Sequence, residues 1–143
     1  MRILGLDLGE RTLGLALSDP LGMVASALKT IRRAGESKDL EALASVIAEQ
    51  EVGEIVVGLP LNMNGSRGPQ AENAEAFAGK LRVRFKLPVH LWDERLSTVA
   101  AERSLLEADL SRQKRKKVID QVAAALFLQS FLDARALARK EKA

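Results

Sequence analysis

The chain has 143 residues, the usual size of one compact domain, of which 47% are hydrophobic and 29% are charged. This balance provides enough apolar side chains for a core and excludes disorder over most of the chain. There is no cysteine, so disulfide scaffolds, thiolate zinc sites and cysteine nucleophiles are excluded, and any histidine chemistry would depend on His90 alone. We therefore expect a single domain over residues 1–143.

Positive charge is concentrated near the C-terminus, although the formal net charge of the chain is only +3. Residues 112–143 contain nine Lys or Arg against three Asp or Glu, whereas the first 111 residues contain thirteen against sixteen. Five of the six residues 112–117 are cations, namely Arg112, Lys114, Arg115, Lys116 and Lys117. Such a run either contacts a phosphate backbone or forms the solvated start of a helix that leads to a frayed basic tail.

No strongly apolar stretch is long enough to cross a bilayer, and the longest covers only residues 122–128. The first residues contain neither a long apolar segment nor a small-residue cleavage site, so they do not resemble a signal peptide. We expect a soluble cytoplasmic protein without a membrane partner.

The first part of the chain has the period of β-strands. Residues 2–7 and 13–17 alternate in the manner of strands, and a turn at residues 9–11 separates them. A second turn at residues 19–22 is followed by a third predicted strand at residues 24–31. These strands are expected to form an antiparallel meander.

The rest of the chain predicts helices that alternate with short strands. Residues 54–58 and 89–92 are apolar runs typical of strands buried on both faces, and residues 60–69 form a polar loop. Helices are predicted from a cap at Ser37 to Val52-Gly53, from Ala71 to Leu81, after a cap at Ser97 or Thr98, and from about Arg115 towards Arg139. Because helices connect them, the last two strands must run parallel to the first, which predicts an α/β sheet.

Three acidic positions are candidates for chemistry in such a sheet, where sites form at the carboxyl ends of parallel strands. Asp7 closes the first strand, and Asp93 and Glu94 close the last, with one of this pair expected to face the site. Asp120 begins a helical stripe with Ala124, Phe127 and Phe131 that should face the sheet.

Each acid also has an ordinary structural explanation. Asp7 could cap its turn or pair with Arg11, Asp93 or Glu94 could pair with Arg95, and Asp120 suits the start of a helix. Taken together, converging carboxylates repel one another unless a divalent cation neutralises them. Ligands that are all oxygen suit Mg²⁺ or Mn²⁺, which promote phosphodiester hydrolysis.

Four segments resemble the signature blocks of the YqgF family, RNase H-like proteins described as pre-16S rRNA nucleases and as Holliday junction resolvases. They are GLDLGERTLGLALSD at 5–19, VGLPLNMNGS at 57–66, DERLSTVAAE at 93–102 and VIDQVAAALFLQ at 118–129. The resemblance implies a ribonuclease H-like fold with strand order 3-2-1-4-5 and a metal-dependent nuclease site. By motif, the catalytic and metal-binding positions of the family fall on Asp7, Glu94 and Asp120, with Asp93 a further candidate ligand.

One departure from RuvC-like resolvases affects the expected metal site. The fourth strand of those enzymes ends in a carboxylate, whereas here it ends in Gly58-Leu59-Pro60 and the acid is supplied one strand further out by Glu94. Two strand spacings separate the backbones of Asp7 and Glu94 by roughly 10 Å. Weak metal affinity in the absence of nucleic acid is therefore expected.

Several basic and polar residues surround the expected metal edge. Arg11, Asn62, Arg67, Arg95 and the run of cations at 112–117 are candidates for binding phosphates, with solvated loop residues as the alternative for Asn62 and Arg67. His90 is expected to be a structural residue rather than a general base. With aromatic residues at 3%, recognition of nucleic acid by shape and backbone is favoured over stacking on bases.

The preferred function is a metal-dependent nuclease acting on precursor rRNA, with ribosome association as an added expectation. The alternative within the same chemistry is a Holliday junction resolvase acting on branched DNA, which requires two sites and hence a homodimer. An ATP-dependent sugar kinase or actin-like fold shares the first turn but needs a second domain. A non-catalytic RNA-binding module would retain the acids for structure alone.

Overall fold

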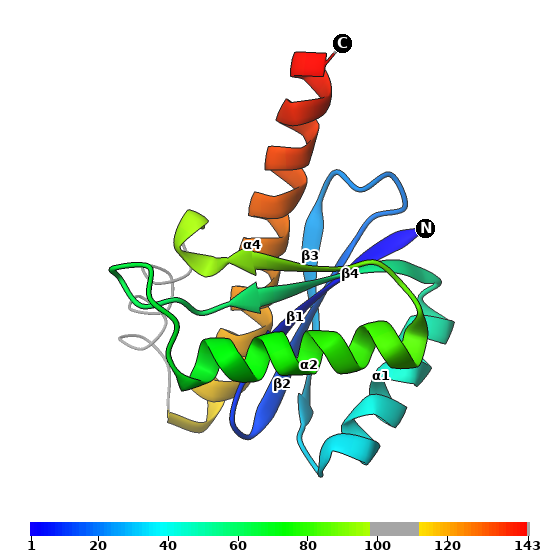
Figure 1. Cartoon of the computed structure of the whole chain (residues 1–143). Helices are drawn as coiled ribbons and strands as arrows, with labels where there is room; N and C mark the ends of the chain where they lie inside the picture. The colour runs from blue at the N-terminus through cyan, green and yellow to red at the C-terminus, as the bar shows by residue number, and fades with distance from the viewer. Residues whose placement is uncertain (98–111, 143) are drawn as a thin grey trace.

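One mixed sheet of five strands organises the molecule (Figure 1). The computed structural model describes residues 1–97 and 112–142, and of residues 112–118 the backbone alone. The strands are β1 (Arg2–Leu8), β2 (Thr12–Ser18), β3 (Ala25–Arg32), β4 (Val52–Leu59) and β5 (Val89–Asp93). Their order is β3-β2-β1-β4-β5, which confirms the predicted fold class and strand order.

The first three strands form the predicted antiparallel meander, and β4 and β5 run parallel to β1. In β4, residues 55–58 are buried, as its apolar sequence predicts. By contrast, β5 is not buried on both faces, because it lies at the edge of the sheet and only Val89 is fully covered. The short apolar run at 89–92 identified the strand but not its position in the sheet.

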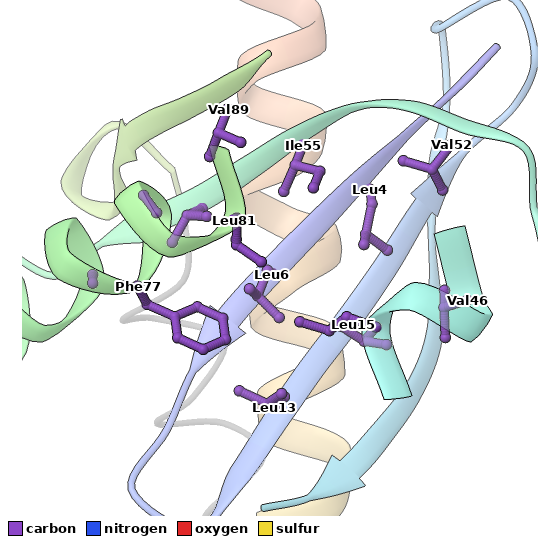
Figure 2. Close-up of a cluster of buried hydrophobic side chains, with 14 residues drawn as sticks. Leu4, Leu6, Leu13, Leu15, Val46, Val52, Ile55, Phe77, Leu81 and Val89 are labelled. Carbon is purple, nitrogen blue, oxygen red and sulfur yellow. The ribbon is translucent and has the colours of Figure 1, made fainter. Parts of the chain in front are cut away.

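Helices cover both faces of the sheet, α1 (Glu36–Glu49) and α2 (Pro69–Phe85) on one and α4 (Arg112–Lys142) on the other (Figure 1). The α1 and α2 side holds the larger core, with Leu4, Leu6, Leu13 and Leu15 of β1 and β2 packed against Val46 and Phe77 (Figure 2). On the other side, Ala124, Phe127 and Phe131 are buried beneath α4, as the predicted stripe requires. No helix in the described part of the chain has the length and apolarity needed to span a bilayer.

Both predicted boundaries of the first helix differ from the structure. Helix α1 begins at Glu36, with Gly35 at the N-cap, so the predicted cap at Ser37 is wrong. The carboxylate of Asp39 accepts a hydrogen bond from the Ala34 backbone N–H (2.9 Å) and forms an ion pair with Arg33 (3.1 Å). These contacts, rather than a cap at Ser37, organise the start of the helix. At its other end α1 stops at Glu49, because Val52 already belongs to β4.

The final helix is longer than predicted. It is helical from Arg112 to Lys142, a segment rich in good helix formers such as Ala, Leu, Lys and Arg. A short 3-10 helix, η1 (Glu94–Leu96), follows β5. The helix predicted after Ser97 or Thr98 lies outside the described residues.

Candidate active site

A cavity of about 160 Å³ lies at the carboxyl ends of β1 and β4, where the sequence predicts a site. The acids Asp7, Glu94 and Asp120 all line it, although they come from β1, η1 and α4. Its other lining residues are Leu8, Gly9, Glu10, Arg33, Pro60, Gln70 and Asn73. The structure therefore brings the three predicted acids to one pocket.

Asp7 lies near the end of β1, and only 6% of its surface is exposed. In the sheet it stands opposite Gly14 of β2, and the next residue, Leu8, also lines the cavity. A carboxylate this deeply buried requires hydrogen bonds, a cation or both. Burial at the carboxyl end of a central strand makes Asp7 the most enclosed acid of the pocket.

Asp120 reaches the pocket from α4, which packs closely against β2. A Cβ atom at Gly14 would lie 2.2 Å from the Asp120 carbonyl oxygen, so the glycine permits this close approach of helix and strand. The hydroxyl of Thr12, at the start of β2, donates a hydrogen bond to the Asp120 carboxylate. This bond holds the side chain of Asp120 at the rim of the cavity.

Glu94 occupies the first position of η1, directly after β5. Its Oε1 atom is buried and has no hydrogen-bond partner among the described residues. A Cβ atom at Gly58 would lie 2.8 Å from Oε1, so the glycine at the end of β4 leaves the space that this oxygen fills. An unpartnered buried carboxylate oxygen is costly unless a cation or a donor from a ligand satisfies it.

Asp93 does not line the cavity. It caps η1 by accepting the Arg95 backbone N–H (2.9 Å), and its carboxylate also pairs with the Arg95 guanidinium (2.7 Å). The hydrogen bonds from Arg95 hold the pKa of Asp93 below its ordinary value. Of the two neighbouring acids, Glu94 is thus the one that faces the pocket, and Asp93 is neutralised by Arg95.

Arg33 was not predicted, yet it places a positive charge on the cavity wall. Its guanidinium donates to the Gly9 carbonyl (3.0 Å) and pairs with the buried carboxylate of Asp39 (3.1 Å). It therefore connects the turn after β1 with the start of α1. Nothing local in the sequence distinguishes Arg33 from its neighbour Arg32, because the contacts that select it come from distant segments.

Gln70 and Asn73 also line the pocket and were missed. They lie in the first turns of α2, three residues apart and therefore on one face of the helix. The sequence contains a signal for them, since two amides share this spacing at the start of a predicted helix that follows the polar loop.

None of the predicted phosphate-binding residues whose side chains the structure describes lines the cavity. Arg11 is exposed in the turn between β1 and β2, and Asn62 is exposed in the loop before α2, where its amide donates to Ser66 (2.9 Å). Arg67 pairs with Glu75 of α2 (3.0 Å), and Arg95 also donates to the Met63 carbonyl (3.3 Å). The side chains of Arg112, Lys114, Arg115, Lys116 and Lys117 lie outside the described residues.

His90 lies away from the pocket, in a cluster that joins the sheet to α4. Its Nε2 atom contacts the Glu54 carboxylate, which also accepts a hydrogen bond from Arg135 (2.8 Å). The Arg135 guanidinium lies 4.5 Å from the centroid of the Phe131 ring. These contacts agree with a structural role for the single histidine.

The donor set of the pocket fits a hard divalent cation, because its acids present only carboxylate oxygens and one of these, Oε1 of Glu94, lacks a partner. The three acids nevertheless do not form a compact cage. Over residues 1–97 and 112–142, no group of three Asp, Glu, His or Cys side chains is close enough to hold a metal ion. Coordination by these acids alone would thus be incomplete, in line with the wide spacing expected from the sequence.

Known proteins resemble this chain over nearly its full length. A family model described as "RuvX: Holliday junction resolvase" matches residues 1–134. A protein of Moorella thermoacetica named "Putative pre-16S rRNA nuclease" is 60% identical over 133 residues, which cover 93% of this chain and 95% of that protein. A protein of Geobacillus kaustophilus with the same name is 59% identical over 137 residues, covering 94% of this chain and 99% of that protein.

Solved structures share the fold at much lower sequence identity. The structure of "T. thermophilus RuvC in complex with Holliday junction substrate" matches with a TM-score of 0.57 and 13% identity, over 95% of this chain and 96% of that one. The fowlpox virus Holliday junction resolvase matches with a TM-score of 0.52 and 13% identity, over 96% and 99% of the two chains. The family resemblance of the four sequence blocks is thereby confirmed, and this chain belongs to the RuvX family of RNase H-like proteins.

Proposed function

We propose that this chain is a metal-dependent nuclease that hydrolyses phosphodiester bonds of structured nucleic acid, with Asp7, Glu94 and Asp120 as its catalytic and metal-binding residues. The observation that carries the proposal is the single cavity lined by all three carboxylates. The three acids belong to different elements, Asp7 to β1, Glu94 to η1 and Asp120 to α4. An acidic pocket of this kind disfavours binding of anions until a cation is present.

Mg²⁺ or Mn²⁺ is the cation that these oxygen ligands fit. When bound, it would activate water and stabilise the charge that develops on the phosphate. Asp7, Glu94 and Asp120 would hold it, and Thr12 would orient Asp120 through its hydroxyl. Because the acids are too widely spaced for a complete cage, phosphate oxygens of the substrate are expected to complete the coordination.

The basic residues would bind and orient the substrate. Arg33 supplies a guanidinium on the cavity wall. Arg95 lies in η1 next to Glu94, and turns or loops carry Arg11, Asn62 and Arg67. The run of cations at 112–117 precedes Asp120 along the chain and would contact the backbone of an incoming strand. With only four Phe and one Trp in the chain, recognition of shape and phosphates is favoured over base stacking.

Precursor 16S rRNA is the substrate that we favour, because relatives that match almost the whole chain carry the name "Putative pre-16S rRNA nuclease". Maturation of this RNA would place the protein in the cytoplasm, in association with the ribosomal small-subunit precursor. The second candidate is resolution of Holliday junctions, which the description of the family model favours. That activity requires a homodimer, because a symmetric junction presents two scissile positions.

The test compares cleavage of a precursor rRNA fragment, which contains an immature end of 16S rRNA, with cleavage of a four-way DNA junction in Mg²⁺ or Mn²⁺. Wild type should cleave the RNA, and Asp7→Asn should reduce the rate at least about 100-fold. Asp133→Asn, which changes an exposed acid of the same helix as Asp120, is the matched control and should retain activity.

Each alternative has its own result. Preferential cleavage of the junction by a dimer would favour the resolvase, whereas a protein that stays monomeric on junction DNA would exclude it. RNA binding that persists in EDTA, without cleavage in either metal, would indicate a non-catalytic binding module. Equal cleavage by wild type and Asp7→Asn would show that the site is assigned wrongly.

A further inference from the structure

Ser130 of α4 connects two segments on the side of the sheet where Glu94 lies. Its hydroxyl oxygen accepts a hydrogen bond from the indole Nε1–H of Trp92 (3.1 Å) and donates one to the carbonyl of Leu96 (3.0 Å). Trp92 belongs to β5 and Leu96 to η1. A single hydroxyl therefore attaches α4 to the residues on either side of Asp93 and Glu94.

The hydrogen bonds of η1 hold the backbone of Glu94 rather than its carboxylate. Its Oε1 atom has no partner within the described residues, and the local contacts of η1 involve the Glu94 carbonyl instead. That carbonyl accepts the Ser97 hydroxyl (2.7 Å) and the Ser97 backbone N–H (3.1 Å). A displacement of η1 would thus carry the carboxylate with it.

Asp120 and Ser130 lie on the same helix, ten residues or about 15 Å apart. Near one end of this interval the Asp120 carboxylate is held by Thr12 of β2, and at the other end Ser130 holds η1. Since an α-helix is stiff over this length, the two contacts determine where η1 sits relative to Asp120. Gly58 then provides the space into which the Glu94 carboxylate fits.

We infer that Ser130 is a positioning residue, which holds η1 so that the Glu94 carboxylate lies where it can share a divalent cation with Asp7 and Asp120. The inference rests on the proposed function, because it assigns Ser130 to the same acidic pocket. Ser130 does not line the cavity and would act only through Glu94.

The hydrogen bond to Trp92 gives the test a direct readout, since the chain contains one tryptophan and therefore one indole N–H signal in a ¹H–¹⁵N spectrum. Ser130→Ala should shift this signal and accelerate its exchange with solvent, whereas Ser130→Thr, which keeps a hydroxyl, should preserve it. Ser45→Ala is the matched control, because Ser45 also lies in a helix and its hydroxyl donates to the Glu41 carbonyl of that same helix (3.4 Å).

Activity and metal dependence are then measured on the same proteins. Ser130→Ala should lower kcat and raise the Mn²⁺ concentration for half-maximal cleavage, each about tenfold, with KM for the RNA fragment little changed. Ser130→Thr should restore both values, and Ser45→Ala should alter neither. If Ser130→Ala loses the indole hydrogen bond but keeps the wild-type kcat and Mn²⁺ dependence, Ser130 is merely structural and the inference is overturned.

A Mg²⁺ titration without substrate, carried to a large excess of metal because the affinity without nucleic acid is expected to be weak, separates this inference from the proposed function. Addition of Mg²⁺ to wild type should shift the indole signal, and Glu94→Gln should abolish that shift. If wild type cleaves neither substrate yet shows this Mg²⁺ response, the proposed nuclease function fails while the link between Ser130 and Glu94 stands. An indole signal that responds to Mg²⁺ equally in wild type and in Glu94→Gln would overturn the inference even if the protein is an active nuclease.

Discussion

The hydroxyl of Thr12 on β2 donates a hydrogen bond to the carboxylate of Asp120 on α4, although the two residues are 108 positions apart in the chain. Thr12 follows the turn after Asp7, so this bond connects the strand pair that carries one acid with the helix that carries another. A neutral donor leaves the negative charge of Asp120 in place while restricting its orientation. This arrangement suits a carboxylate that must bind a cation, since an ion pair would neutralise it instead.

Replacement of Thr12 tests that role. Thr12→Val keeps the shape of the side chain but removes the donor, and it should reduce the rate of cleavage about tenfold. Thr12→Ser keeps the hydroxyl and should stay close to the wild-type rate. Nuclease assays at saturating metal, with thermal unfolding of each variant, provide the measurement. Equal rates for the valine and serine variants would contradict the role of the hydroxyl.

Gly14 should tolerate no side chain, because a Cβ atom there would lie 2.2 Å from the backbone carbonyl oxygen of Asp120. Gly14→Ala is therefore expected to push α4 away from β2 and to lower the free energy of unfolding by about 3 kcal/mol. Gly79→Ala in α2 is the matched control, since its Cβ atom would meet nothing within 4 Å. That control should raise stability by about 0.5 kcal/mol. Chemical denaturation curves of the two variants would reveal the contrast, and similar stabilities would disprove it.

Gly58→Ala should affect the site more directly. Its Cβ atom would lie 2.8 Å from Oε1 of Glu94 and 2.7 Å from the Phe127 ring, which is fully buried and has little freedom to move. The carboxylate should be displaced, so cleavage should fall by at least about tenfold. The assay is run well below the melting temperature of the variant, which separates displacement from unfolding. Wild-type activity in Gly58→Ala would mean that the observed position of Glu94 is unnecessary for the reaction.

The ion pair between Glu54 and Arg135 predicts a pH-dependent contribution to stability. Hydrogen bonds from Arg135, together with a contribution from His90, hold the pKa of Glu54 below its ordinary value of 4.5. The contribution is therefore fully present above that value and is lost as the pH falls through the lower pKa of the folded state. Arg135→Met should reduce the free energy of unfolding by about 1 kcal/mol at neutral pH, and by progressively less below pH 4.5.

The comparison for this pair is Arg139→Met, one turn further along α4, where the arginine is exposed. Denaturation of both variants between neutral and acidic pH gives the pH profile. A destabilisation of Arg135→Met that does not change with pH would show that packing on Phe131, rather than the charge on Glu54, accounts for the effect.

The antiparallel meander, the later parallel strands and the sheet edge that carries the site could be predicted because they depend on local patterns, whereas the strand order was implied by the family resemblance. Alternating residues identified the meander, and the apolar run in β4 identified a buried parallel strand. The rule that sites form at the carboxyl ends of such strands then selected Asp7 and the Asp93-Glu94 pair, and the family motif pointed to Glu94 within that pair. Asp120 was found by the helical stripe that it shares with Phe127, because that stripe has to face the sheet.

Other parts of the site depend on contacts between distant segments and left no local pattern. Arg33 differs from Arg32 only because the turn after β1 and the carboxylate of Asp39 surround it in the folded protein. Asp39 likewise took the role that the sequence suggested for Ser37, since its carboxylate reaches the backbone of Ala34. The hydrogen bond from Ser130 to Leu96 joins residues 34 positions apart, and the periodicity of the sequence does not predict such a contact.

The two attachments of α4 restrict how this part of the chain can vary. Successive residues of an α-helix are rotated by about 100°, so deletion or insertion of one residue between Asp120 and Ser130 would turn one of them away from its partner. A substitution between the two residues leaves their relative rotation unchanged, whereas a change in the length of this interval would prevent both attachments from forming together. Related sequences should therefore differ between these two positions by substitutions and not by insertions or deletions.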